Sequence, residues 1–164
     1  MKYLQYATCD VNNGEGLRNV LWLSGCSWGC EGCFNEISWD SKRGKDIDEL
    51  MVEKLLKDLE PLHIQGLTLS GGDPLHKRNY QDIIKLCQRV KYEFPNKDIW
   101  LYTGYTLYQI QNDILRAPIL DTIDILIDGK YDKEDPTKLP FRGSQNQRRY
   151  KLEKGHLNIA IALK

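Results

Sequence analysis

Three cysteines lie close together in the first quarter of the chain, in the run Cys26-Ser27-Trp28-Gly29-Cys30-Glu31-Gly32-Cys33. Thiolates gathered at this spacing are ligands for zinc, copper(I) or an iron–sulfur cluster. A closed structural zinc site takes four protein ligands, usually as two separated pairs, whereas only three thiols are local here. Three ligands on a four-iron cluster would leave one iron open to a small molecule. The spacing therefore favours a metal centre with an open position, as a catalytic site requires.

The remaining two of the five cysteines stand apart, at positions 9 and 87. An odd number of cysteines with three crowded together favours a metal site in a reducing compartment, the cytoplasm, over a disulfide framework. Cys9 leaves one alternative open, because as a fourth ligand it would make an all-thiolate zinc site. Cys87 falls on the apolar stripe of a helical pattern, so we expect a buried core thiol there.

A second segment with chemical potential is the run Ser70-Gly71-Gly72-Asp73-Pro74. It follows a short β-prone run, and glycines at the end of a strand let the backbone approach a ligand and present its carbonyls. The alternative is an ordinary turn from strand to helix in which Asp73 serves as a helix cap. The pattern alone leaves both interpretations open.

The elements that must position these two segments alternate along the chain. Short apolar runs typical of strands lie at 20–24, 67–70, 99–103 and 123–127. Apolar residues recur at helical steps between them, at 47–59 and 80–94 and more weakly at 106–115. This alternation predicts an α/β fold in which βα units form a parallel sheet with right-handed connections.

The carboxyl ends of such parallel strands meet at one edge of the sheet, where ligands bind. The cysteine run and the Gly-Gly-Asp turn both follow predicted strands, and Tyr105 and Asp128 fall at the ends of two others. We therefore expect them to lie at the same edge. Residues 3–9 are a candidate edge strand and 157–163 a candidate last strand, whereas 129–149 are predicted to form a long loop.

The composition bounds the class of protein. The 164 residues predict one domain spanning positions 1–164 and exclude a complete eight-fold α/β barrel. With 23 basic and 23 acidic residues the net charge is +0, so no overall field attracts nucleic acid, and no apolar run reaches the length of a membrane span. A local basic stretch comprises Arg142, Arg148, Arg149, Lys151 and Lys154. It is either solvated surface or a docking site.

The Cys-x3-Cys-x2-Cys run resembles that of the radical S-adenosylmethionine superfamily, with one departure. The superfamily has an aromatic residue just before the third cysteine, whereas this chain has Gly32 there and Phe34 after it. Further segments, in order along the chain, resemble the family of anaerobic ribonucleoside-triphosphate reductase activating proteins. They are Cys33-Phe34-Asn35 with Trp39, Leu69 to Leu75, Tyr102-Thr103-Gly104-Tyr105, Ile127-Asp128-Gly129, Phe141-Arg142-Gly143-Ser144 and Asn146-Gln147-Arg148.

The resemblance implies a single radical-SAM domain over 1–164, built as a partial, open (βα) barrel with a mainly parallel sheet of about five strands. It implies a [4Fe-4S] cluster held by Cys26, Cys30 and Cys33, whose fourth iron is chelated by the amino and carboxylate groups of S-adenosyl-L-methionine. The residues expected around this cosubstrate are Gly32, Cys33, Phe34, Ser70, Gly71, Gly72, Asp73 and Pro74. No catalytic residue is expected beyond the cluster and the cosubstrate.

The implied function is that of a glycyl-radical activase. Its 5′-deoxyadenosyl radical would remove a hydrogen from a glycine of the large subunit of the anaerobic ribonucleoside-triphosphate reductase. A one-electron donor such as a flavodoxin-like protein is implied, as is a homodimer or a heterotetramer with the reductase. Two alternatives stay open: a radical-SAM enzyme acting on a small molecule, and a zinc-stabilised, non-enzymatic binding module.

Overall fold

The computed structural model describes residues 1–153 and 159–163. Its strands are β1 (Lys2–Asp10), β2 (Arg18–Leu23), β3 (Lys45–Asp46), β4 (Gly66–Gly71), β5 (Asp98–Tyr102), β6 (Ile125–Asp128), β7 (Arg148–Glu153) and β8 (Ile159–Leu163). Its α-helices are α1 (Glu49–Leu59), α2 (Tyr80–Glu93) and α3 (Leu107–Gln111), and two 3₁₀ turns are η1 (Glu36–Trp39) and η2 (Ala117–Asp121). The predicted central strands and helices are thus confirmed to within a few residues at each end.

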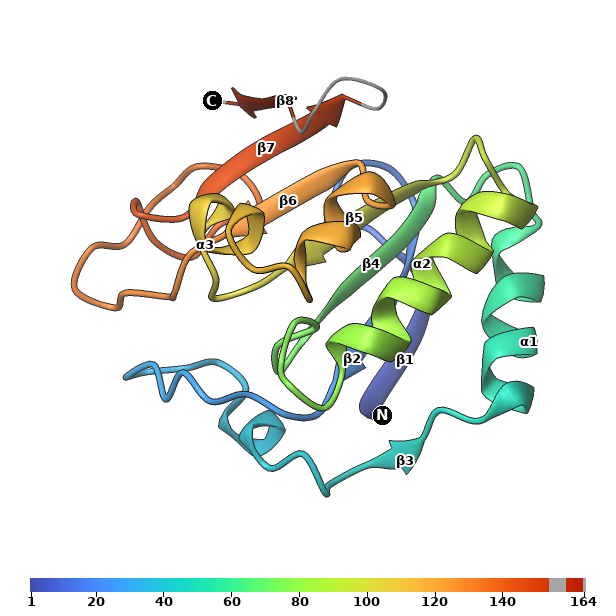
Figure 1. The fold of residues 1–164 in the computed structure, drawn as a ribbon, viewed down its shortest axis with the longest axis horizontal. Helices are drawn as coiled ribbons and strands as arrows, with labels where there is room; N and C mark the ends of the chain where they lie inside the picture. Colours follow the sequence, from blue (N-terminus) through green and yellow to red (C-terminus); the bar gives the residue numbers. More distant parts are fainter. Residues whose placement is uncertain (154–158, 164) are drawn as a thin grey trace.

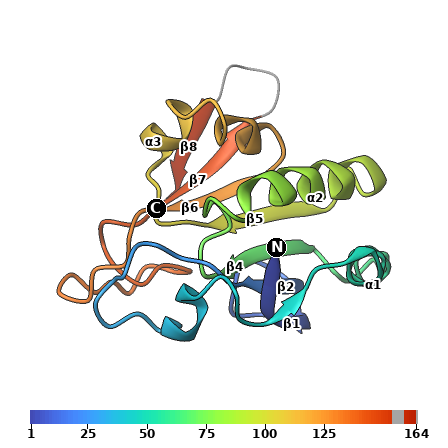
Figure 2. The same ribbon diagram turned by 60° about the horizontal axis from the view of Figure 1, so that its bottom comes forward.

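The described strands form one open, mixed sheet of eight strands in the order β3-β1-β2-β4-β5-β6-β7-β8 (Figure 1). The central strands β2, β4, β5 and β6 are parallel, and their registers place Trp22 beside Ser70 and Thr68 beside Trp100. Antiparallel strands flank this block on both sides, with β1 and β3 at one end and β7 and β8 at the other (Figure 2). The fold is therefore α/β, as predicted.

The expectation of a mainly parallel sheet of about five strands was wrong, because antiparallel pairs outnumber parallel ones. β3 has two residues and no apolar pattern that could have revealed it. β7 was hidden in the basic stretch, where the buried Tyr150 and Leu152 alternate with charged residues. The predicted loop 129–149 consequently ends at the start of β7. Of the predicted strand 157–163, residues 159–163 form β8, and 157 and 158 lie outside the described residues.

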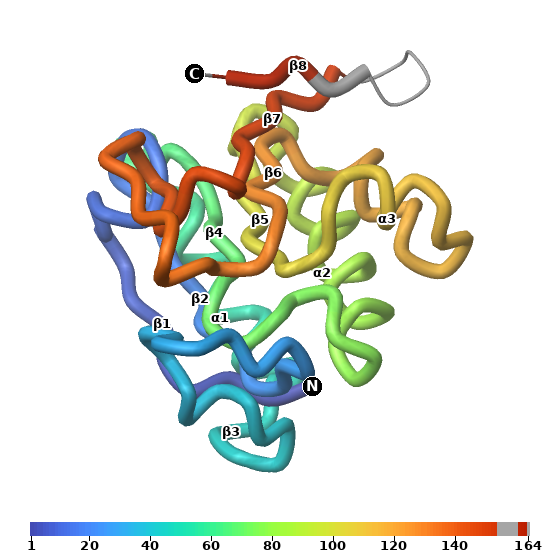
Figure 3. The backbone as a smooth tube through the Cα atoms, turned by 90° about the vertical axis from the view of Figure 1, so that its left-hand side faces the viewer, coloured from blue at the N-terminus to red at the C-terminus, as the bar shows by residue number. Residues whose placement is uncertain are grey.

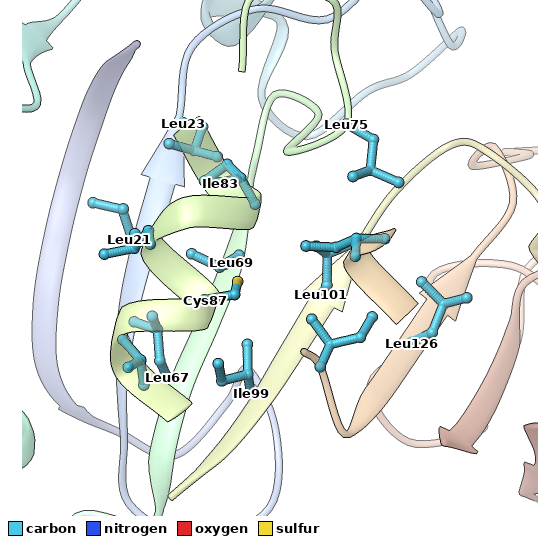
Figure 4. Close-up of a cluster of buried hydrophobic side chains, with 14 of the residues drawn as sticks. Leu21, Leu23, Leu67, Leu69, Leu75, Ile83, Cys87, Ile99, Leu101 and Leu126 are labelled. Atoms are coloured by element: carbon cyan, nitrogen blue, oxygen red, sulfur yellow. The ribbon is translucent and has the colours of Figure 1, made fainter. Parts of the chain in front are cut away.

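The hydrophobic core lies between one face of the sheet and helices α1 and α2. Alternate residues of a strand point to opposite faces, and the core receives Leu21 and Leu23 from β2, Leu67 and Leu69 from β4, and Ile99 and Leu101 from β5. Figure 4 shows Ile83 and Cys87 of α2 among these side chains. Cys87 is fully buried, which confirms its prediction as a core thiol. No helix in the described parts of the chain has both the length and the apolar character needed to cross a membrane.

The opposite face of the sheet is polar and aromatic. The residues that alternate with the core leucines there include Trp22, Ser70 and Tyr102, and helices α1 and α2 do not cover them. A sheet with one face packed on helices and the other lined by such side chains leaves room for a ligand on the second face. Trp22, Ser70 and Tyr102 on this face lie near the carboxyl ends of their strands.

Arg18 ties the amino ends of three parallel strands together. Its side chain is 0% exposed and lies 2.5 Å from the carboxylate of Asp98 at the start of β5. Its Nε donates to Thr68 Oγ1 of β4 at 2.8 Å. A buried guanidinium without its counter-ion is costly, so the pair constrains how β2, β4 and β5 begin.

We predict that Asp98→Ala lowers the free energy of unfolding by about 3 kcal/mol, the lower end of the range for a broken buried pair because Asp98 is partly exposed. Urea denaturation followed by circular dichroism measures the change. The matched control is Asp46→Ala, which breaks the exposed ion pair with Lys2 and should change stability far less. Equal effects of the two substitutions would contradict the structural role of the buried pair.

Candidate active site

The loops that follow the parallel strands meet at one edge of the sheet and enclose a cavity of about 720 Å³. In Figure 1 the segment after β2 and the segment before β7 extend from the same side of the sheet, and Figure 3 views the molecule from that side. Such a volume is typical of a ligand pocket. Among its lining residues are Cys26, Cys30, Cys33, Phe34, Ser70, Gly71, Gly72, Tyr102, Thr103 and Gly104.

The structure brings most of the predicted site residues to this cavity but leaves three of them outside its lining. Gly32 is exposed in the cysteine loop, and Asp73 and Pro74 are buried behind the wall. Phe34 stands at the mouth, 85% exposed. Cys9 is exposed at the end of β1 and does not line the cavity, so the geometry does not support it as a fourth ligand.

The cysteine loop, residues 24–39, is closed by its own backbone. Gly25 N donates to Ser38 O at 2.7 Å, and Cys26 N donates to Trp39 O at 3.3 Å. Three glycines in or beside the cysteines, Gly25, Gly29 and Gly32, have positive φ, which a residue with a side chain adopts only at a cost. The chain therefore turns sharply between its thiols, and all three thiols reach the same cavity.

Gly71 and Gly72 bring the end of β4 against the end of β2. Gly72 N donates to Leu23 O and Asp73 N to Gly25 O, each at 2.8 Å. A Cβ on Gly72 would lie 2.6 Å from Gly25 O, closer than van der Waals contact allows. The two glycines are thus required by the packing of one loop on another, whereas the sequence suggested a close approach to a ligand.

The Asp73 carboxylate is enclosed by donors of the chain itself. One oxygen accepts from Leu75 N and Thr103 Oγ1, each at 2.8 Å, and the other accepts from Gly104 N at 3.1 Å and from the indole N–H of Trp28. Burial raises the pKa of this carboxyl, and the four hydrogen bonds oppose that rise because they favour the charged form.

Tyr105 and Asp128, for which the sequence suggested no role, support the loops around the cavity. The Tyr105 ring packs edge-on against Trp28, with centroids 4.7 Å apart. The buried Asp128 accepts from Leu107 N at the start of α3 and from Arg148 N at the start of β7. Burial raises the pKa of Asp128 as well. Both residues therefore stabilise protein segments around the cavity.

The segment 129–147 forms one wall of the cavity, which sequence reasoning missed. Its Tyr131 packs on Phe34, with ring centroids 5.0 Å apart, and its Lys133 pairs with Glu31 of the cysteine loop. Gln147 holds the segment in shape by accepting from Gly143 N at 2.8 Å and donating to Gly129 O at 3.0 Å. The contacts of Tyr131 with Phe34 and of Lys133 with Glu31 join residues far apart in sequence, so no local spacing signals them.

The basic stretch does not form one exposed surface. Arg149 is largely buried, pairs with Glu15 at 2.8 Å and lies over the rings of Trp100 and Phe141. Lys154 lies outside the described residues. Part of the stretch therefore belongs to the interior of the protein.

The donor chemistry of the cavity fits an iron–sulfur cluster. Among the described residues, no three His, Cys, Asp or Glu side chains converge as ligands of a single metal ion would. A four-iron cluster takes one thiolate per iron, so three thiols around one cavity suit it without such convergence. Burial raises the pKa of the Cys26 thiol to about 11, while a hydrogen bond from the backbone N–H of Trp28 opposes the rise and the Asp73 charge adds to it. Binding of iron would displace that proton.

Comparison with known proteins agrees with this chemistry. A family model described as a 4Fe-4S single cluster domain matches residues 12–150. The curated anaerobic ribonucleoside-triphosphate reductase-activating protein of Pasteurella multocida is 49% identical over 156 residues, which cover 93% of this chain and 98% of that protein. The proteins of the same name from Haemophilus influenzae and Escherichia coli are 48% and 43% identical over 93% and 90% of this chain, and 100% and 96% of their own lengths.

The chain belongs to the family of anaerobic ribonucleoside-triphosphate reductase-activating proteins. The resemblance seen in the sequence motifs is thereby confirmed at the level of the family. The match to the 4Fe-4S domain covers the cysteine loop, the Gly-Gly-Asp turn and the segment 129–147 together. An iron–sulfur cluster is thus the group that this activating-protein domain carries.

We predict that Gly72→Ala reduces the iron and sulfide taken up on anaerobic reconstitution several-fold, because the new Cβ would push Gly25 and the cysteine loop out of place. Colorimetric iron and sulfide determination measures the loss. The matched control is Gly29→Asn, where a Cβ meets nothing within 4 Å and asparagine tolerates the positive φ. Full cluster content in the Gly72 variant would show that the contact between the loops does not hold the site.

Proposed function

We propose that this protein is the activating enzyme of an anaerobic ribonucleoside-triphosphate reductase and forms the glycyl radical on that enzyme's large subunit. We further propose that residues 1–164 make up a single radical-SAM domain of the partial, open barrel type. The observation that carries the proposal is that the three thiols and the Gly-Gly turn line one cavity at the carboxyl ends of parallel strands. Membership of the activating-protein family supports it independently.

In this proposal Cys26, Cys30 and Cys33 hold a [4Fe-4S] cluster with one open iron, where S-adenosyl-L-methionine binds. When bound and reduced, the cluster supplies one electron to the sulfonium of the cosubstrate, which releases methionine and a 5′-deoxyadenosyl radical. Phe34, Ser70, Gly71 and Gly72 line the cavity and are the residues proposed to contact the cosubstrate. Gly32, Asp73 and Pro74 shape the loops behind them.

In this proposal the chain's own residues bind and orient the cluster and the cosubstrate, and they move no proton in the reaction. The backbone at Ser70 and Gly71 ends β4 beside Trp22 and Leu23, so its carbonyls are held rigidly by the sheet. A rigid acceptor array suits the ammonium group of the cosubstrate, because preorganised dipoles need no rearrangement on binding. The wall formed by 129–147 and the cysteine loop limits the access of water from one side.

The cavity mouth fits a protein substrate. Phe34 and Ile37 line the cavity and expose large apolar side chains, which a partner would cover on docking. We propose the glycine segment of the reductase's large subunit as that partner, with electrons from a flavodoxin-like donor. A homodimer or a heterotetramer with the reductase is the expected assembly. A reducing cytoplasm is the compartment in which free thiols of this kind persist.

The test uses protein reconstituted anaerobically with iron and sulfide, reduced, and mixed with S-adenosyl-L-methionine and the large subunit. We predict that 5′-deoxyadenosine forms and that the large subunit acquires a stable glycyl radical, seen by electron paramagnetic resonance. Cys26→Ala, Cys30→Ala and Cys33→Ala should each abolish both signals, because each thiol holds one iron.

The matched control is Cys9→Ala, which removes an exposed thiol outside the cavity and should leave both signals intact. Radical formation that survives loss of any one of the three clustered thiols would refute the proposal. Loss of the metal in the Cys9 variant, together with zinc in the isolated protein, would favour a four-thiol structural site.

A further inference from the structure

The Asp73 carboxylate has no capacity left for a ligand. It accepts four hydrogen bonds from the protein, it is 1% exposed, and it is absent from the lining of the cavity. A carboxylate has about four lone-pair sites, so four donors satisfy it fully. A cosubstrate amino group could reach it only after one of these hydrogen bonds breaks.

The four donors come from three separate parts of the chain. Leu75 N lies in the same turn, and Thr103 Oγ1 and Gly104 N follow β5. The fourth donor is the Trp28 indole, which lies between Cys26 and Cys30. The Asp73 side chain thus joins the turn after β4, the end of β5 and the cysteine loop.

Trp28 is half-buried and lines the cavity, and three neighbours contact its ring, so the hydrogen bond has a fixed direction. Its ring meets Tyr105 edge-on, and Lys130 Nζ lies 4.6 Å from its centroid. Gly104 packs so closely on the indole that a Cβ there would overlap the ring. An indole fixed in this way can position the loop that carries it.

We infer that Asp73 is a positioning residue that acts through the indole N–H of Trp28, holding the thiols of the cysteine loop in place, and that it is not a ligand of the cosubstrate. This rests on the proposed function, in which those thiols hold the cluster. A hydrogen bond to a buried carboxylate is among the strong ones, because the acceptor is charged. Losing it frees the loop between the first two thiols and leaves a buried acceptor without its donor.

The experiment compares Asp73→Asn, Trp28→Phe and the double variant with the unaltered protein, all reconstituted and matched for iron content. Phenylalanine keeps an aromatic ring but has no N–H, and asparagine keeps the shape but turns an NH₂ toward donors. We expect both single variants to release iron to a chelator about tenfold faster. We expect the dissociation constant of Asp73→Asn for S-adenosyl-L-methionine, measured by equilibrium dialysis, to stay within about twofold, since the Asp73 side chain does not line the cavity.

The double variant should release iron no faster than the more affected single variant, because the two changes remove one interaction. Trp28→His is the rescue variant, since its Nε2–H lies as many bonds from Cβ as the indole N–H of tryptophan. It should restore most of the slow iron release that Trp28→Phe loses.

A tenfold weaker affinity for S-adenosyl-L-methionine in Asp73→Asn would overturn the inference and make Asp73 a direct ligand. Additive effects in the double variant would overturn it too. Failure of the unaltered protein to bind any cluster would instead refute the proposed function, so the two failures are distinguishable.

Discussion

The site depends on one contact, the close approach of two loop backbones at the ends of β2 and β4. Gly72 lies so near Gly25 that no side chain fits between them, and Asp73 N donates to Gly25 O at 2.8 Å. Asn79, the residue just before α2, stabilises this contact, because its side-chain amide donates to Ser24 O at 2.8 Å and to Asp73 O at 3.1 Å. The parallel pairing of β2 and β4 brings the loops together, and the glycines let them touch.

This junction links the two motifs that carry the chemistry. The cysteine loop leaves from one side of it and the Gly-Gly-Asp turn from the other, so a cluster and a cosubstrate bound there would be neighbours. The polar face of the sheet and the segment 129–147 complete the walls, whereas the exposed Phe34 marks the open side. An architecture of this kind suits chemistry on a large partner, since the partner covers what the short chain leaves open.

Local patterns predicted the parts of the site that are local in sequence. The thiol spacing and the glycine pair stand next to strands with clear apolar runs, so the βα arrangement placed them at one edge. The Trp28–Asp73 hydrogen bond and the Phe34–Tyr131 contact join positions 45 and 97 residues apart, and periodicity carries no information about such pairs. Strand β7 was not predicted from the sequence, because only two of its residues, Tyr150 and Leu152, are buried and their neighbours are charged. The expectation that Asp73 contacts the cosubstrate came from family resemblance. The hydrogen-bond donors around its carboxylate support the positioning role inferred above.

The most direct test of the central claim is an electron paramagnetic resonance spectrum of the reconstituted, reduced protein before and after S-adenosyl-L-methionine is added. The account predicts a reduced [4Fe-4S] signal that changes on addition, because the cosubstrate binds the one iron that the three thiols leave open. A cluster signal that stays the same would contradict the open iron. A protein that takes up zinc and forms no cluster would contradict the radical chemistry altogether.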